Sequence, residues 1–225
     1  MCRPLSGLRI TLACDGGGHK RHDGPAAILS GHSLQHGIHM DDARRALADA
    51  LDDYSRRWPI EAAVARFLEF LGGQAEAFKR QLAIGHFTGS AWLVSADRSR
   101  VLLTHHRKLG RWLQLGGHAD GDTDLAHVAL REAEEESGLD GLTVEPAIFD
   151  LDRHRIPARG TYPEHWHYDV RYVVRAGANE AFVVSDESHE LAWREIASLI
   201  DDQETDTSVR RMAGKWVSRA AIAMP

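Results

Sequence analysis

The order of secondary-structure signals along the chain predicts an α/β protein, a three-layer α/β/α sandwich with a mixed sheet and an N-terminal helical extension. Helical periodicity dominates residues 41–81, whereas apolar runs typical of strands dominate much of residues 86–175. One amphipathic helical pattern lies among these strands, and a further one lies near the C-terminus. Strands that flank a central helix and precede a later one favour a single sheet with helices on both faces.

The helical extension is expected within residues 40–82. Apolar residues recur at near-helical spacing over residues 41–57, which predicts a first helix. Pro59 interrupts the pattern, because proline disfavours a helical conformation in the residue before it. We expect a second helix over residues 60–71 and a short third helix over residues 74–81.

Strand signals follow the extension. The expected strands cover residues 86–95, 100–105, 143–154, 165–175 and 182–184. The first two flank a turn at residues 97–99 and predict a hairpin. Within residues 165–175, polar and apolar side chains alternate, which predicts a strand with one polar face. Helices are expected over residues 195–200 and 206–223.

The central helix carries an unusual group of carboxylates. Residues 116–139 read GGHADGDTDLAHVALREAEEESGL. At ~100° per residue, Glu132, Glu135 and Glu136 fall within about 100° of one another. Carboxylates this close repel one another and raise at least one pKa unless a cation lies among them. Ligands that are all oxygen suit Mg²⁺ or Mn²⁺ rather than zinc. The glycines before the helix allow close backbone approach, so a carbonyl there is a candidate further ligand.

The spacing of this segment resembles the Nudix hydrolase signature. Residues match at the required offsets from the opening glycine to the closing apolar residue: Gly117, Arg131, Glu132, Ala133, Glu135, Glu136, Gly138 and Leu139. A pattern with this many fixed positions is far more specific than a lone glycine motif. The resemblance covers roughly residues 84–202. It implies a Nudix-type sandwich, and we expect a Nudix hydrolase domain over residues 83–225.

The resemblance also implies the chemistry. Nudix enzymes typically hydrolyse a nucleoside diphosphate linked to another group, with Mg²⁺ or Mn²⁺ as cofactor. By this resemblance Glu132, Glu135, Glu136 and the carbonyl of Gly117 hold the metal. Arg131 orients the glutamates through charge-assisted hydrogen bonds. Either Glu132 or a carboxylate outside the motif accepts the proton of the attacking water.

One signature position departs from the family pattern. The first glutamate of the signature falls on Thr123, which is a favourable residue for a helix N-cap. We therefore predict that Thr123 begins the helix, and that Asp120 or Asp122 supplies any missing charge. In many relatives a glutamate from a later loop joins the site. Glu187 and Glu190, in the loop expected before Trp193, are the candidates for that role.

Substrate contacts outside the signature are predicted from basic residues near strand ends. His105 and Arg107 follow one strand, and Arg153 and Arg155 end another. Each is a candidate phosphate ligand, with a solvated strand end as the alternative. The histidines and aspartate that share one strand face, His165, His167 and Asp169, suggest either a metal site or a polar outer face. We favour the polar outer face.

Composition limits the partners. The formal net charge of −6 gives no overall nucleic-acid footprint, and no apolar run is long enough to span a membrane. Cys2 and Cys14 form no disulfide framework, which favours a reducing cytoplasm. Residues 1–39 are expected to be a disordered or non-native extension. The expected partner is a small nucleotide-type diphosphate, with a homodimer as a candidate assembly.

Two other readings remain open. A catalytically weak Nudix-fold module for ligand sensing or regulation is supported only by Thr123. The intact Arg131-Glu132 and Glu135-Glu136 pairs argue against it. A Nudix-fold isomerase of isopentenyl diphosphate requires a core cysteine, and both cysteines lie outside the expected core. The class of nucleotide substrate does not follow from the sequence, because base and sugar recognition lies in variable loops.

Overall fold

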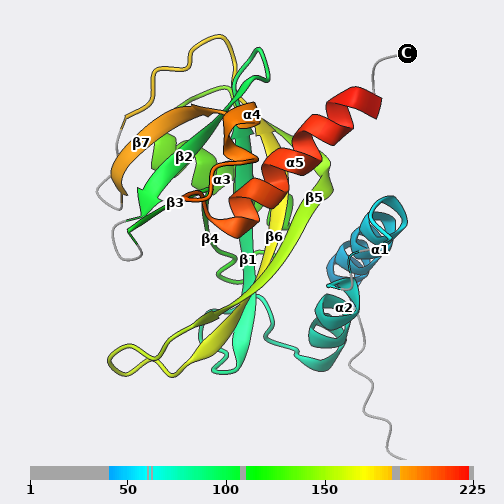
Figure 1. The fold of residues 1–225 in the computed structure, drawn as a ribbon. Helices are drawn as coiled ribbons and strands as arrows, with labels where there is room; N and C mark the ends of the chain where they lie inside the picture. Colours follow the sequence, from blue (N-terminus) through cyan, green and yellow to red (C-terminus); the bar gives the residue numbers. More distant parts are fainter. Residues whose placement is uncertain (1–40, 60, 62, 107–109, 184–187, 223–225) are drawn as a thin grey trace, which may run out of the picture. The chain divides into compact units, whose positions relative to one another are not determined.

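The computed structural model describes residues 41–222 except for residues 60, 62, 107–109 and 184–187 (Figure 1). All of the described residues belong to one compact unit. The extension predicted for residues 1–39 lies outside them. Within the described parts of the chain, no helix has both the length and the apolarity needed to cross a bilayer.

The described chain forms one mixed sheet with helices on both faces. The helices are α1 (Asp42–Arg57), α2 (Val64–Gly73), α3 (Leu125–Ser137), α4 (Ile196–Leu199) and α5 (Thr207–Ile222). The strands are β1 (Gly85–Val94), β2 (Arg100–His106), β3 (Arg111–Leu113), β4 (Leu115–His118), β5 (Thr143–Ile156), β6 (His165–Arg175) and β7 (Ser188–Glu195). The strand order is β3-β2-β1-β6-β5, with β4 also paired to β1 and β7 to β2. Only the β1–β6 pair among these is parallel, so the predicted mixed sheet is confirmed.

Alternation along β1 separates two hydrophobic layers. Phe87, Ala91 and Leu93 pack with side chains of α1, α2 and α3. Trp92 and Val94 face the opposite way and pack with α4 and α5. Figure 1 shows α5 in front of the sheet and α3 behind it. The predicted three-layer sandwich is therefore confirmed.

The N-terminal helical extension is present as α1 and α2. Asp41 caps α1, and its carboxylate accepts a hydrogen bond from the Arg44 backbone N–H at 2.9 Å. From α2, Phe70 stacks on Tyr168 of β6 with ring centroids 3.9 Å apart. The two helices thus share a core with the sheet. A domain boundary near residue 82 stays a prediction.

The third helix predicted over residues 74–81 is wrong, because this segment forms turns. Its backbone groups bind partners outside a helix. The buried Arg44 guanidinium donates to the carbonyls of Gln74 at 2.9 Å and Ala75 at 3.1 Å. The Ala77 carbonyl accepts from the Phe87 N–H at 2.8 Å, which joins the turn to β1. These contacts replace the hydrogen bonds that a helix would make internally.

The strand predicted over residues 182–184 is also wrong for its described part. Phe182 and Val183 lie outside any strand, and the Val183 N–H donates to the Ser137 carbonyl at 2.7 Å, at the end of α3. Val184 lies outside the described residues. The strand in this region is β7, which pairs antiparallel with β2 and contains Trp193.

Candidate active site

Gly117 lies on β4 and the signature residues from Arg131 to Glu136 lie on α3, and these two elements pack against each other and against β1. The predicted helix start at Thr123 is wrong. Asp124 is the N-cap, and its carboxylate accepts from the backbone N–H groups of Ala126 and His127, each at 3.1 Å. A carboxylate that accepts two of the free N–H groups satisfies the helix terminus better than a threonine hydroxyl that accepts one. At the other end Gly138 adopts φ 66°, which closes α3 in the left-handed conformation.

Two glutamates of α3 converge on the glycines of β4. A Cβ atom at Gly117 would overlap the Glu132 carboxylate, so a side chain at this position would displace that carboxylate. The Glu136 carboxylate accepts from the Gly116 N–H at 3.4 Å. The two carboxylates therefore approach adjacent residues of the same strand.

Arg131 holds this group together. Its guanidinium donates to the Glu132 carboxylate at 2.9 Å and to the His118 carbonyl at 3.2 Å. It also lies 3.9 Å from the Glu135 carboxylate. The hydrogen bond to Glu132 raises the pKa of Arg131. Glu132 is mostly buried, with a side chain 16% exposed, whereas the Glu135 side chain is 64% exposed. Arg131 thus joins the helix glutamates to β4.

The loop between β4 and α3 holds the two aspartates that were predicted to support the site. Asp120 pairs with Arg80, whose hydrogen bonds hold the pKa of the carboxyl below its usual value. Burial disfavours the ionised form of Asp122, but hydrogen bonds from His127 and the Asp124 N–H hold its pKa below the usual value. Both aspartates thus have partners of their own, and their role at Thr123 stays a prediction.

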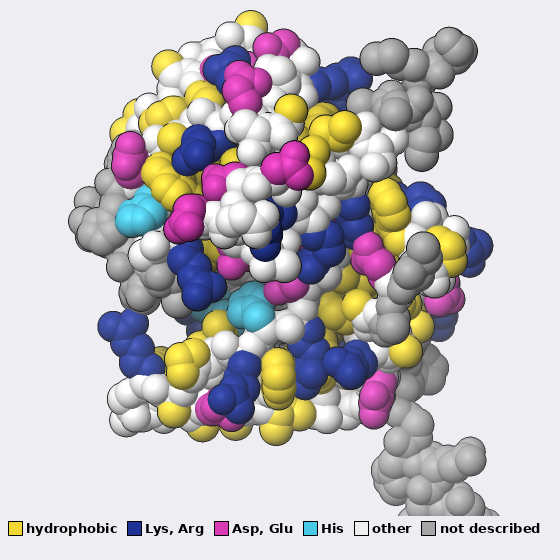
Figure 2. Space-filling view, viewed as in Figure 1, with side chains coloured by type: hydrophobic (Ala, Val, Ile, Leu, Met, Phe, Trp, Pro, Cys, Tyr) yellow, Lys and Arg dark blue, Asp and Glu magenta, His cyan; other side chains and the backbone are white. Residues whose placement is uncertain are grey.

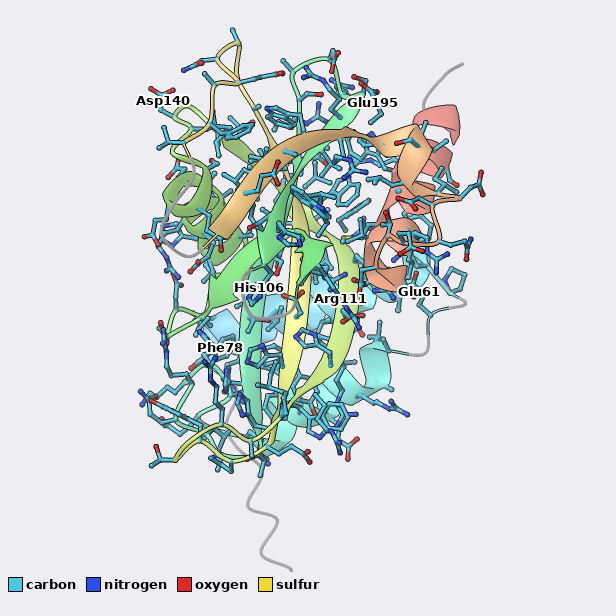
Figure 3. The ribbon with its side chains drawn as sticks, turned by 60° about the vertical axis from the view of Figure 1, so that its left-hand side comes forward. Glu61, Phe78, His106, Arg111, Asp140 and Glu195 are labelled. Atoms are coloured by element: carbon cyan, nitrogen blue, oxygen red, sulfur yellow. The ribbon has the colours of Figure 1, made fainter. Side chains whose placement is uncertain are left out.

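The predicted phosphate ligands do not all lie together. The His105 ring packs against Trp112 with centroids 5.3 Å apart, near the end of the β2–β3 pair, where Figure 3 shows His106 and Arg111 close together. Arg107 lies outside the described residues. The Arg153 guanidinium lies 3.6 Å from the centre of the Trp166 ring. Arg155 pairs with Glu164 at 3.3 Å on the surface. Substrate contact by any of them stays a prediction.

Glu190 does not lie in a loop, as was predicted, but in β7 opposite His105 of β2. The backbone is extended here because β7 pairs with β2. This pairing also covers an edge of β2 that would otherwise be open. Glu187 lies outside the described residues. A role for either glutamate in catalysis stays a prediction.

The polar face of β6 is buried at Asp169 and Arg171, contrary to the predicted polar outer face, whereas His165 and His167 are partly exposed. Asp169 and Arg171 are each 2% exposed, because α5 covers this side of the sheet. The Asp169 carboxylate accepts from Ser90 at 2.7 Å, Thr88 at 2.9 Å, the Arg171 guanidinium at 2.7 Å and Gln114 at 3.3 Å. Sequence reasoning missed this centre. A signal was present in the sequence: Asp150 and Asp152 lie two residues apart on β5, and Arg211 and Lys215 lie four residues apart on α5.

A mixed sheet between helices, with the glutamates of one helix turned toward a glycine-rich strand, defines the class of Nudix proteins. The family model of the NUDIX domain matches residues 86–214. This chain therefore belongs to the Nudix family. The match begins in β1 and ends within α5, so it includes both the β4–α3 site and the helices on each face.

Solved structures of the family are similar at low identity. An Ap4A hydrolase of C. elegans in a binary complex is 15% identical, with a TM-score of 0.47 over 60% of this chain and 97% of that chain. A NUDIX-family hydrolase from Clostridium perfringens is 22% identical, with a TM-score of 0.43 over 60% and 97%. The NUDIX domain of Shewanella oneidensis NrtR, complexed with ADP ribose, is 20% identical, with a TM-score of 0.43 over 65% and 93%. The search of curated proteins found no match. Likeness at this level carries no information on substrate.

Proposed function

We propose that this protein is a divalent-metal-dependent hydrolase that cleaves a pyrophosphate bond in a nucleoside diphosphate linked to another group. The observation that carries the proposal is the convergence of Glu132 and Glu136 on the backbone of Gly116 and Gly117. Family membership supports the reaction class. The fold alone would not, because one fold serves many functions.

The donor set fits a hard divalent cation. The carboxylates of Glu132, Glu135 and Glu136 and the carbonyl of Gly117 provide only oxygen ligands, which suit Mg²⁺ or Mn²⁺. The cation would neutralise charge on the diphosphate and acidify a bound water. Absence of a side chain at Gly117 leaves its backbone accessible to the Glu132 carboxylate.

The protein groups then have distinct roles. Arg131 keeps Glu132 oriented through their hydrogen bond. Glu132, or a carboxylate outside the signature, accepts the proton of the attacking water. Arg155, which now pairs with Glu164 in solvent, is available to exchange that partner for a phosphate.

A panel of substrates tests the proposal. Nucleotide sugars, dinucleotide cofactors, dinucleoside polyphosphates, ADP-ribose and nucleoside triphosphates are incubated with the full chain and Mg²⁺ or Mn²⁺, and nucleoside monophosphate and phosphate release are measured. We expect turnover of one class that a chelator abolishes. Turnover that is equal with chelator contradicts the metal requirement. Binding of a panel member without turnover favours the ligand-sensing alternative.

A substitution at Thr123 tests whether the natural site is a full hydrolase site or a weakened one. We expect Thr123→Glu to change kcat by less than about threefold, because Asp120 and Asp122 already place negative charge in the same loop. Thr123→Gln is the matched control, with the same added length and no charge. A gain of about tenfold, equivalent to about 1.4 kcal/mol of barrier, that is specific to Thr123→Glu would show that the natural site lacks a carboxylate.

A further inference from the structure

Five histidines gather on the α5 side of the sheet, and we refer to them as the histidine cluster. Its members come from four strands: His86 of β1, His118 of β4, His154 of β5, and His165 and His167 of β6. His86 lies opposite His167, which in turn lies opposite His154. Ring centroids of neighbours are 4.7–5.3 Å apart. Figure 2 shows that histidine side chains reach the surface on the face that carries α5, with Lys and Arg nearby.

Three of these rings present nitrogens to one another. One ring nitrogen from each of His86, His118 and His167 lies within 4.8 Å of the other two. His86 is only 2% exposed, and neither of its ring nitrogens has a hydrogen-bond partner among the described residues. Nε2 of His167 has none either. A buried polar atom left unsatisfied costs about 1–3 kcal/mol, so native proteins rarely leave several together.

His86 and His167 have the protonation state that binds metal. Burial lowers the pKa of His86 to about 4, and the neighbouring His118 and His165 add to the effect. Burial, with His86 and His154, lowers the pKa of His167 to about 2. Both rings are therefore neutral near pH 7, with a lone pair available on one nitrogen.

We propose that His86, His118 and His167 form a binding site for a zinc-type transition-metal ion, separate from the glutamate site. Three imidazoles favour Zn²⁺, Co²⁺, Ni²⁺ or Cu²⁺ over Mg²⁺, which prefers oxygen ligands. Metal–nitrogen bonds of about 2.0–2.1 Å place tetrahedral ligands about 3.3 Å apart, so the rings close slightly on binding. The fourth position is left to water, as in three-histidine zinc sites.

The other two histidines differ from these three. Nδ1 of His165 lies 2.9 Å from the Pro163 carbonyl, and Nδ1 of His154 lies 3.1 Å from the Asp152 carboxylate. Their rings are thus oriented by other groups, whereas one nitrogen of each of His86, His118 and His167 lies within 4.8 Å of the other two. The site is therefore assigned to His86, His118 and His167. Because these ligands come from β1, β4 and β6, the ion would join three strands next to Gly117.

The proposal does not rest on the proposed hydrolase activity, and its test uses metal binding alone. The metal-free full chain is titrated with Co²⁺, followed by visible absorption, and with Zn²⁺ in competition with a chromophoric chelator, both in excess Mg²⁺. We expect one equivalent to bind. His86→Gln should weaken this binding at least about a hundredfold, because even outer-shell changes cost 10–100-fold. Glu136→Gln should bind normally, which distinguishes the two sites.

Matched variants keep the test decisive. His127→Gln changes an exposed histidine outside the cluster and should leave binding unchanged. His118→Gln repeats the loss at a less buried ligand, so misfolding of the His86 variant cannot explain both results. Circular dichroism and melting in chelator check the fold of each. Absence of binding by the wild type overturns the proposal, as does binding that survives both variants, which would assign the ion to other groups such as Cys2 or Cys14.

Discussion

Glu136→Gln is expected to lower kcat at saturating substrate by at least about a hundredfold, because loss of a metal-ligand charge exceeds the 10–100-fold cost of outer-shell changes. Gln keeps the size of the side chain and an oxygen that can accept from the Gly116 N–H, now 3.4 Å from Glu136. The helix and its packing should therefore persist, and the loss should come from the charge. Steady-state kinetics with Mg²⁺ or Mn²⁺ on the substrate found by the panel measure it.

The matched control is Glu134→Gln. Glu134 lies two residues away on α3, is exposed and falls outside the signature. The substitution Glu134→Gln removes the same charge from the same helix. A general electrostatic effect would therefore lower kcat equally in the Glu134→Gln and Glu136→Gln enzymes. A Glu136→Gln enzyme that retains kcat within about threefold of wild type would remove Glu136 from the metal site.

The site could be predicted where its geometry is local. Gly117, Arg131, Glu132 and Glu136 lie on two consecutive elements, and helical spacing alone brings the glutamates to one side. The long alternating strand over residues 165–175 was equally readable, and β6 has those bounds. Such features depend on neighbours in sequence. The prediction of Thr123 as the first residue of the helix was wrong although it depended on local sequence. Both Thr123 and Asp124 are suitable N-caps, and the backbone conformation determines which one is used.

Features that depend on strand pairing could not be predicted. His86 and His167 are 81 residues apart and become neighbours only through the β1–β6 register. A shift of one residue would place the two rings on opposite faces. Burial of Asp169 and Arg171 likewise depends on α5 covering the sheet. Charged side chains in a strand usually face water, and only the tertiary structure supplies the partners that allow them to be buried.

Asp150 is the residue on which this buried charge centre depends. Its carboxylate is fully buried and accepts from Lys215 at 2.6 Å, Arg211 at 2.7 Å and Arg171 at 3.2 Å. Lys215 also donates to the Tyr54 hydroxyl at 2.5 Å, which joins α5 to α1. Each cation also pairs with a second carboxylate, Arg171 with Asp169, Arg211 with Asp152 and Lys215 with Glu61, but Asp150 is the carboxylate that contacts all three.

Asp150→Asn is therefore expected to lower the free energy of unfolding by about 3–5 kcal/mol, the cost of removing one charged partner from a buried ion-pair network. Urea unfolding followed by circular dichroism measures it. Asp53→Asn is the control, because Asp53 pairs with Arg56 on the exposed face of α1, and it should cost no more than about 0.5 kcal/mol. Equal effects of the two variants would contradict a structural role for the buried centre.

Acid should remove the difference between wild type and Asp150→Asn. Burial alone would raise the pKa of Asp150, but Arg211, Arg171 and Lys215 hold it below its usual value. A carboxyl with a lowered folded-state pKa stabilises the fold above its unfolded pKa of about 4 and loses that contribution as pH falls through the folded pKa. The gap between wild type and Asp150→Asn should thus be largest near neutral pH and narrow below about pH 4. If the difference in unfolding free energy stays constant into acid, the loss in Asp150→Asn comes from the geometry of the Asn side chain. The charge of Asp150 would then contribute nothing to stability.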